Sequence, residues 1–364
     1  MQPFALERFF ARHEFNVKHI LSASDVEALN VQELLSLTDE ETRTLWNNLK
    51  LSYTETLGHP QLLAEISRMY RHIDYRHLLV AAPEELIYIA FHVLLTKDDH
   101  VIVTAPAYQS LHEIGSHIGC HLDRWNLDRT QNGWELDLQY LRGRVTDKTR
   151  LIVINFPHNP TGHQISVEDQ RQIMEIARKR GIWIFSDEMY RGAEYRNEDQ
   201  LPAVADEYDR GISLWGLSKS FALPGLRLGW LASQNGEFLA RCSEMRDYLT
   251  ICNSAPGEIL GIMALRARER ILHRTKEIIG KNLASADAFF AQHTNEFQWL
   301  RPKAGSVAFP ILRGDIPIKV YCQELIRTKS LLLTPGSLFQ YEGNHFRIGL
   351  GRRDFGEAIE LLSS

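Results

Sequence analysis

The stretch LWGLSKSFALPGLRLGW, from Leu214 to Trp230, places a lysine just after an apolar run. The run at 212–217 predicts a buried strand, and Lys219 follows its end. Because burial lowers the pKa of an amine, a lysine at this place can act as a nucleophile and form a Schiff base with a carbonyl. Eight residues later, Arg227 can bind an anion with its planar guanidinium. For this stretch alone, an exposed loop with an ordinary surface lysine is the alternative interpretation.

Length and composition favour a globular protein with two domains. The chain has 364 residues, which is long for one hydrophobic core, so we expect one large domain and one smaller domain. Hydrophobic residues make up 44% and charged residues 24%, both ordinary values for a globular protein. The formal net charge is −5 and the sequence has no basic block, so nucleic acid is not an expected partner.

Cysteine and histidine spacing predicts neither a metal site nor a disulfide framework. The four cysteines are scattered without a CxxC pair, and the fifteen histidines show no HExxH motif. The first residues lack the pattern of a signal peptide, and no apolar run approaches the length of a membrane span. We therefore expect a cytoplasmic protein with reduced thiols, no metal and no contact with a membrane.

Apolar runs alternate with amphipathic segments through the middle of the chain. This α/β pattern predicts a mostly parallel sheet with helices on both faces, in which ligands bind at the carboxyl ends of the strands. The strands are expected at 101–104, 151–155, 182–186, 212–217 and 228–232, and the helices at 84–95, 108–118 and 166–180.

The two ends of the chain are expected to form a small α+β domain. We predict that residues 1–50 join the small domain, that 51–265 form the large domain, and that 266–364 form the small C-terminal domain. Helical spacing occurs at 7–12, at 26–37 and over much of 237–292. It is followed by a helix at 318–326, strands at 331–334 and 346–350, and a last helix from residue 354.

Polar residues follow the predicted strands. Asn159 lies in the motif Asn-Pro-Thr-Gly after the strand at 151–155, and Asp187 and Tyr190 follow the strand at 182–186. A buried carboxylate such as that of Asp187 needs a cationic partner, and the amide of Asn159 offers a donor and an acceptor. A simple Asn-Pro turn and a helix cap are the structural alternatives for these residues.

These residues occur in an order that resembles a known family. From about residue 50 to its end, the chain is similar to the fold type I pyridoxal-phosphate (PLP) enzymes, specifically the class I/II aminotransferases. The most specific parts are Asn-Pro-Thr-Gly, Asp-x-x-Tyr and Ser-Lys with an arginine eight residues later. In order, the matching residues are Tyr53, Tyr108, Asn159, Asp187, Tyr190, Ser218, Lys219, Arg227 and Arg347.

The resemblance implies roles around the ring of a PLP cofactor bound by the large domain. Lys219 would hold PLP as a Schiff base and later move a proton between the substrate and the cofactor. Asp187 would pair with the pyridine nitrogen and keep it protonated, so that the ring accepts electrons. Asn159 and Tyr190 would hydrogen-bond the ring hydroxyl oxygen, and Tyr108 would stack on the ring.

The resemblance also implies contacts to the cofactor phosphate. Arg227 would bind it together with Ser218 and with the helix start at Ala82, Pro83 and Glu84, where free N–H groups and the helix dipole favour an anion. The sequence departs from the family here, because Pro83 has no N–H and the Glu84 carboxylate would repel a phosphate. Glu84 can turn away and donate only its backbone N–H.

The implied substrate contacts come from both ends of the chain. Arg347 would hold the substrate α-carboxylate as a bidentate pair, with Asn159 beside it, although an arginine on a strand more commonly extends to solvent. Ser22, in the segment 22–25, would stand in for the glycine-rich substrate loop of the family. Tyr53 would reach the phosphate of the neighbouring subunit, which implies a homodimer.

We therefore predict a PLP-dependent aminotransferase that moves an amino group between an α-amino acid and a 2-oxo acid through a Schiff base on Lys219. The alternative is another PLP-dependent reaction at Cα, such as β-elimination, decarboxylation, or the chemistry of capreomycidine-synthase and arginine-oxidase types of natural-product enzyme. A transcription regulator built on this fold is disfavoured, because fewer than sixty residues precede Tyr53 and they contain no helix-turn-helix pattern.

Overall fold

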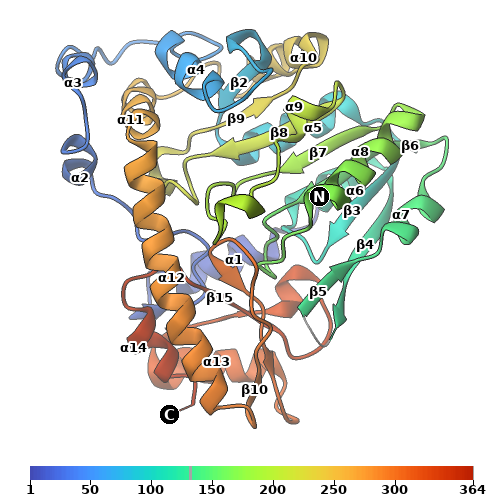
Figure 1. Cartoon of the computed structure of the whole chain (residues 1–364), viewed down its shortest axis with the longest axis vertical. Coiled ribbons are helices and arrows are strands. Elements are labelled where there is room, and N and C mark those ends of the chain that lie inside the picture. Colours follow the sequence, from blue (N-terminus) through green and yellow to red (C-terminus); the bar gives the residue numbers. More distant parts are fainter. Residues whose placement is uncertain (131–132, 364) are drawn as a thin grey trace.

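The computed structural model of the chain describes residues 1–130 and 133–363 (Figure 1). An eight-stranded sheet lies at the centre of the larger body. The long helix α12 (Arg268–Gln292) leads from this body to a smaller one that contains α13 (Ile318–Lys329) and α14 (Phe355–Glu360). Among the described residues, no helix is both long enough and apolar enough to cross a membrane.

The large sheet is mostly parallel, as predicted. Strands β8, β7, β6, β3 and β4 run in one direction, whereas β9 and β5 run against their neighbours. Strand β4 was not predicted, because its charged side chains interrupt the apolar run that the other strands show. In spatial order the strands are β2 (Leu78–Ala81), β9 (Gly229–Ala232), β8 (Gly211–Gly216), β7 (Trp183–Asp187), β6 (Thr149–Asn155), β3 (His100–Ala105), β4 (His121–Thr130) and β5 (Gly133–Leu136).

Helices cover both faces of this sheet. Val101 and Val103 of β3 belong to a core shared with α5 (Pro83–Leu94), α6 (Ser110–Ile118) and α10 (Gly236–Arg246), whereas Ile102 between them belongs to a core shared with α7 and α8. Burial on both faces explains why these strands are continuous apolar runs. The other helices of this body are α4 (Pro60–Ser67), α7 (Leu138–Arg144), α8 (Val167–Arg180), α9 (Val204–Glu207) and α11 (Ala255–Arg266).

The smaller body has a separate core and short strands. Strands β11, β15 and β14 form an antiparallel sheet, β10 pairs with β12, and β1 pairs with β13 in parallel. The strands are β1 (His19–Ile20), β10 (Phe297–Gln298), β11 (Val307–Ala308), β12 (Ile311–Leu312), β13 (Leu331–Leu332), β14 (Thr334–Pro335) and β15 (Phe346–Gly349). Short 3₁₀ turns lie at η1 (Tyr75–His77), η2 (Asn197–Asp199), η3 (Pro224–Leu226) and η4 (Gly336–Phe339).

The N-terminal segment contacts both bodies. It begins with α1 (Ala5–His13), and its strand β1 lies beside β13. Val26 belongs to the core of the smaller body, whereas Leu34 packs with residues of α11. The domain boundaries at residues 50 and 265 stay a prediction.

The helix expected at 26–37 is wrong in its length. Helix α2 spans only Val31–Leu35, because Asn30 caps it and closes a capping box with Glu33. A further helix that was not predicted, α3 (Glu40–Asn47), begins after a second capping residue, Asp39. Two caps in one polar segment divide it into two short helices.

The carboxyl ends of β6, β7 and β8 bring distant segments together. Asn155 at the end of β6 pairs in register with Asp187 at the end of β7, and Asp187 pairs with Leu214 of β8. The loop with Asn159 follows β6, and Lys219 follows β8. Because parallel neighbours end at the same edge, these polar side chains share one site.

Gly349 of β15 holds the N-terminal segment against the strand that carries Arg347. The N–H of Gly349 donates to the carbonyl of Leu21 at 2.6 Å, and a Cβ at Gly349 would lie 1.6 Å from the carbonyl oxygen of Ala23. Gly349→Ala should therefore push this segment away from β15 and lower the free energy of unfolding by about 1–3 kcal/mol, as overpacking does. Urea unfolding followed by tryptophan fluorescence measures the loss.

Gly280→Ala is the matched control. Gly280 is exposed in α12, and a Cβ there would meet no neighbouring atom within 4 Å. Alanine at this position should stabilise the protein by about 0.5–1 kcal/mol through its helix propensity. Equal free energies of unfolding for the two variants would contradict the packing argument.

Candidate active site

A cavity of about 390 Å³ lies at the carboxyl edge of the large sheet. Its walls come from α1, the segment 23–25, the start of α5, the ends of the parallel strands and β15. Ten residues that the sequence singled out line it: Pro83, Glu84, Tyr108, Asn159, Asp187, Tyr190, Ser218, Lys219, Arg227 and Arg347. Three others do not line it: Ser22, Tyr53 and Ala82.

Lys219 extends into this cavity from the loop after β8. Its Nζ donates a hydrogen bond to Ser24 Oγ at 2.7 Å. Burial lowers the pKa of Lys219; Asp25 opposes this shift, and Arg347 adds to it. An amine with a lowered pKa is the nucleophile that the sequence predicts at this place.

Asp187 is buried at the end of β7. Its Oδ1 accepts a hydrogen bond from the N–H of Met189 at 3.0 Å, and Asn155 Nδ2 donates to its carbonyl at 2.8 Å. Burial raises the pKa of Asp187 to about 6, and Lys219 opposes this shift. A buried carboxylate in this state lacks a close cationic partner and would accept a proton or a cation from a ligand.

Arg347 is almost fully buried on β15 and faces Asn159. Its Nη1 donates to Asn159 Oδ1 at 3.2 Å, and its Nη2 donates to the carbonyl of Ser22 at 2.9 Å. The guanidinium carbon lies 5.8 Å from the ring centre of Phe10 and 5.2 Å from that of Phe339. Arg347 does not extend to solvent, so the commoner alternative for an arginine on a strand is wrong here.

Two buried polar atoms of the cavity residues have no hydrogen-bond partner among the described residues. They are Ser218 Oγ and Arg347 Nε. Burial raises the pKa of Tyr190 to about 12, so its phenol keeps its proton at neutral pH. Because an unpaired buried polar group is costly, such a set indicates a site that a polar ligand completes.

Glu84 and Tyr108 form the wall near α5. Glu84 lines the cavity, and its carboxylate accepts a hydrogen bond from Ser110 Oγ at 3.2 Å. Burial raises the pKa of Glu84 to about 7. Tyr108 donates its hydroxyl proton to Glu7 at 2.7 Å and contacts the ring of Phe4.

Arg227 lines the cavity from the other side of the Lys219 loop. Its backbone has a φ of 51°, in the left-handed region, and it directly follows η3. Its Nη1 donates to the carbonyl of Pro224 at 3.2 Å. The rest of the guanidinium has no partner among the described residues, so it can bind an anion.

The sequence missed the part of the wall that α1 forms, where Glu7, Phe10 and Glu14 line the cavity from the helix and its C-cap. Ser24 and Asp25 line it from the segment 22–25, which the sequence had placed at the site. The sequence did contain a pattern that indicates this wall, because positions 7, 10 and 14 share one face of a helix. In the segment 22–25, Ser24 faces the cavity in place of the expected Ser22, which contributes only its carbonyl to the neighbouring arginine.

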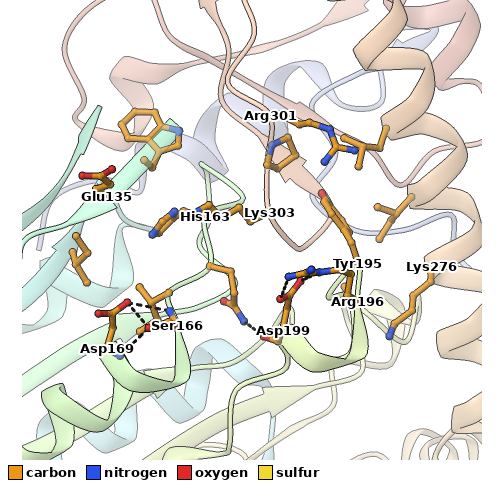
Figure 2. Close-up of a pocket in the computed structure, with 18 of the residues that line it drawn as sticks. Glu135, His163, Ser166, Asp169, Tyr195, Arg196, Asp199, Lys276, Arg301 and Lys303 are labelled. Carbon is orange, nitrogen blue, oxygen red and sulfur yellow. Dashed lines mark hydrogen bonds and ion pairs between the residues drawn. The ribbon is translucent and has the colours of Figure 1, made fainter. Parts of the chain in front are cut away.

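A larger hollow of about 1040 Å³ lies elsewhere, beside α12 (Figure 2). Some of its charged side chains already have partners on the wall: Arg196 pairs with Asp199 at 2.6 Å, and Asp169 accepts a hydrogen bond from Ser166 at 2.7 Å. Figure 2 shows these pairs on its wall, and none of the predicted site residues. The smaller cavity, which holds Lys219, is therefore the candidate active site.

Among the described residues, no group of three or more histidine, cysteine, aspartate or glutamate side chains could hold a metal ion. A parallel sheet with a lysine, a buried aspartate and an arginine at its carboxyl edge defines the class of fold type I PLP-dependent enzymes. The model of the aminotransferase class I and II family matches residues 21–356, so this chain belongs to that family. It is a PLP-dependent aminotransferase with small-molecule amino acid and 2-oxo acid substrates.

Among the similar proteins are two aminotransferases and one synthase. A PLP-dependent aminotransferase from Streptococcus suis is 29% identical, with a TM-score of 0.92 over 100% of this chain and 96% of that chain. Capreomycidine synthase from Streptomyces vinaceus is 27% identical over 348 residues, which are 94% of this chain and 88% of that protein. Aspartate aminotransferase from Sulfolobus acidocaldarius is 24% identical over 307 residues, which are 79% of this chain and 74% of that protein.

The residues of the cavity fit PLP. The hydroxyl groups of Tyr190 and Ser218 are donors that a ring oxygen and a phosphate can use, and Ser218 Oγ is buried without a partner among the described residues. Asp187 is a buried acceptor for a protonated ring nitrogen, and Lys219 is a sheltered amine. Arg227 supplies a cation for the phosphate.

Glu84 should make the stability of the cofactor-free protein depend on pH. Its pKa rises from the ordinary 4.5 to about 7 on folding, so between these values the folded state holds a proton that the unfolded state has released. Stability should therefore fall as the pH rises from about 5 to about 7. Glu84→Gln removes this titration, and its free energy of unfolding should change less between pH 5 and pH 8.

Urea unfolding of the cofactor-free proteins at both pH values measures the difference. Glu135→Gln is the control, because Glu135 is an exposed carboxylate outside the cavity and should leave the pH dependence of the wild type unchanged. An identical pH dependence for Glu84→Gln and the wild type would show that Glu84 titrates normally in the fold.

Proposed function

We propose that the amino-group transfer takes place in the cavity around Lys219, with the roles that the family resemblance implies. The observation that carries the proposal is the convergence of Lys219, Asp187 and Arg347 on one cavity from three distant segments. Amino-acid chemistry with PLP requires three groups together: a nucleophilic amine, a buried acceptor for a pyridinium, and a guanidinium that binds a carboxylate. None of the three residues would indicate this chemistry if it stood alone.

Bound PLP supplies an electron sink for negative charge at the substrate Cα. Lys219 would hold the cofactor covalently, and its Nζ, when free, would move the proton at Cα. Ser24 holds that Nζ in place through the hydrogen bond at 2.7 Å. Asp187 keeps the pyridine nitrogen protonated, because a cation placed beside this buried carboxylate favours its charged form.

The remaining cofactor contacts follow from donors and rings on the cavity wall. Tyr190 and Asn159 donate hydrogen bonds to the ring hydroxyl oxygen. Tyr108, oriented by its hydrogen bond to Glu7, stacks on the ring. Each of these contacts uses a side chain that already lines the cavity.

The phosphate is held by Arg227, Ser218 and the start of α5. Glu84 lies near this place, but its raised pKa allows a large share of it to be protonated at neutral pH. A protonated Glu84 donates a hydrogen bond to the phosphate and does not repel it. This resolves the departure of the sequence from the usual phosphate loop of the family.

Arg347 binds the substrate α-carboxylate. Its hydrogen bonds to Asn159 and to the Ser22 carbonyl fix the guanidinium plane before the substrate arrives. A guanidinium that is already oriented loses little entropy when it forms a bidentate pair with a carboxylate.

We also propose a homodimer in which Tyr53 reaches the phosphate of the neighbouring site. Tyr53 is 87% exposed in the single chain. Thr54 Oγ1 donates to the Asn253 carbonyl at 3.2 Å, so this segment lies beside the loop that follows α10. Leu51, Tyr248, Leu249 and Ile251 are exposed on the same two segments. An apolar patch of this kind is typical of a surface that a partner covers.

Another reaction at Cα is the alternative, and the similarity to capreomycidine synthase is the observation that favours it. Product analysis separates the two. Transfer gives a keto acid and an aminated partner, whereas elimination releases ammonia and other Cα chemistry leaves the 2-oxo acid unchanged.

Lys219 should carry the cofactor. Borohydride reduction of the PLP-loaded protein followed by peptide mass mapping should place a phosphopyridoxyl group on this lysine, because it is the amine that lines the cavity. Lys219→Ala should take up no label and lose turnover. Lys303 lies outside the cavity, so Lys303→Ala should keep both the label on Lys219 and the turnover. A label on any other lysine would refute the proposed site.

Tyr53 should act across the subunit interface. Sedimentation should give a particle of twice the chain mass, and Tyr53→Phe should weaken PLP binding. A hybrid of one Lys219→Ala subunit and one Tyr53→Phe subunit should regain one intact site, because the first subunit lends its Tyr53 to the second. A fully active monomer, or a hybrid no better than its parents, would rule out the shared site.

A further inference from the structure

Three carboxylates line the wall of the active-site cavity that the N-terminal segment forms. Glu7 and Glu14 lie on one face of α1 and its C-cap, with Phe10 between them, and Asp25 follows from the next segment. The ring of Phe10 lies 5.8 Å from the guanidinium carbon of Arg347. This face of α1 is therefore next to the group that binds the substrate α-carboxylate.

The three carboxylates differ in what they already bind. Glu7 accepts the hydroxyl proton of Tyr108 at 2.7 Å, and Asp25 pairs with Arg352 at 3.1 Å. The backbone N–H of Glu14 donates to the carbonyl of Phe10, but its carboxylate has no hydrogen bond or ion pair to any described residue. Burial raises the pKa of Glu14 and repulsion from Asp25 adds to the shift, whereas Arg352 opposes it. The charged form of the Glu14 carboxylate is thus disfavoured in the cavity, and a bound cation would stabilise it.

The cations of the cavity are already assigned. Lys219, Arg227 and Arg347 are its basic lining residues among the described part of the chain, and the proposed function uses them for the cofactor, the phosphate and the α-carboxylate. Arg352 lies outside the lining and is already paired with Asp25 at 3.1 Å, so no cation of the lining remains for an acidic substrate side chain. Because Glu7 and Glu14 have no such cationic partner, a substrate side chain meets a negative field along α1.

A separate observation shows that this cavity is built for a polar ligand. Ser218 Oγ and Arg347 Nε are buried without a partner among the described residues, and both side chains line the cavity. The residues themselves are 5% and 2% exposed. The carboxylates thus face a space that a ligand is needed to complete.

We propose that the amino acid substrate carries a cationic side chain, an ammonium or guanidinium group that Glu14 binds, with Glu7 and Asp25 beside it. This inference rests on the proposed function, because it takes the cavity around Lys219 as the active site. The α-carboxylate lies at Arg347, and the side chain extends along the face of α1 past Phe10 to Glu14. An acidic substrate such as aspartate would meet like charges there.

Three carboxylic acids of similar length test this inference in binding alone. They are 5-guanidinopentanoate, its neutral isostere 5-ureidopentanoate, and the dianion pimelate; none has an amine that could react with the cofactor. Calorimetric titration of the PLP-loaded enzyme should show that the guanidino acid binds at least about tenfold tighter than the ureido acid, since a charge-assisted contact is worth about that much. Pimelate should bind most weakly.

Variants separate Glu14 from the rest of the site. Glu14→Gln should remove about tenfold or more of the advantage of the guanidino acid and leave the ureido acid nearly unchanged. Arg347→Lys should weaken both acids by a similar factor and preserve their ratio, because both present a carboxylate. Glu135→Gln, an exposed carboxylate outside the cavity, should change neither.

Two results would overturn the inference: pimelate binding as tightly as the guanidino acid, or an unchanged ratio in Glu14→Gln. Turnover tests the proposed function separately, with lysine, ornithine, arginine and norleucine as amino donors to a 2-oxo acid. A cation preference in binding without any keto acid product would refute transamination alone. A faster turnover of norleucine than of the cationic amino acids would refute the substrate class alone.

Discussion

The site depends on the loss of water from charged groups at the carboxyl edge of the parallel sheet. Strands β6, β7 and β8 are covered by helices on both faces and end side by side, so Asp187 is buried and Lys219 is sheltered as the chain leaves the sheet. Desolvation raises the pKa of the carboxyl group and lowers that of the amine. A ligand with a ring cation and a carbonyl pairs the cation with the buried carboxylate and reacts through the carbonyl with the buried amine. One edge of the sheet can therefore hold PLP.

A second constraint is the close approach of the N-terminal segment to β15. Gly349 leaves no room for a side chain against Ala23, and the same strand carries Arg347, whose guanidinium donates to the carbonyl of Ser22. Arg347 is therefore oriented by a segment more than three hundred residues away in sequence. If Arg347 binds the substrate α-carboxylate as proposed, packing at Gly349 and recognition of that carboxylate depend on each other.

The charges of the cavity divide into two regions. Arg227, Ser218 and the start of α5 face the proposed phosphate, and there the raised pKa of Glu84 reduces the repulsion that its charge would cause. Along α1 the carboxylates of Glu7 and Glu14 remain, together with Asp25. Because the family's chemistry at Cα is common to many substrates, this second region is the one that we propose selects the substrate class.

The sequence by itself determined the parallel sheet, the family and ten of the cavity residues, because apolar runs and short motifs such as Asn-Pro-Thr-Gly record local structure and strand order. It misjudged the segment 26–37, where the cap at Asn30 outweighs helical spacing. Only the tertiary structure decided that α1 covers the cavity, that Ser24 replaces Ser22 there, and that Glu84 faces inward. The reason is physical: helical periodicity predicts that a face will be buried, but which distant surface buries it is set by how the segments pack, and no local pattern encodes that choice.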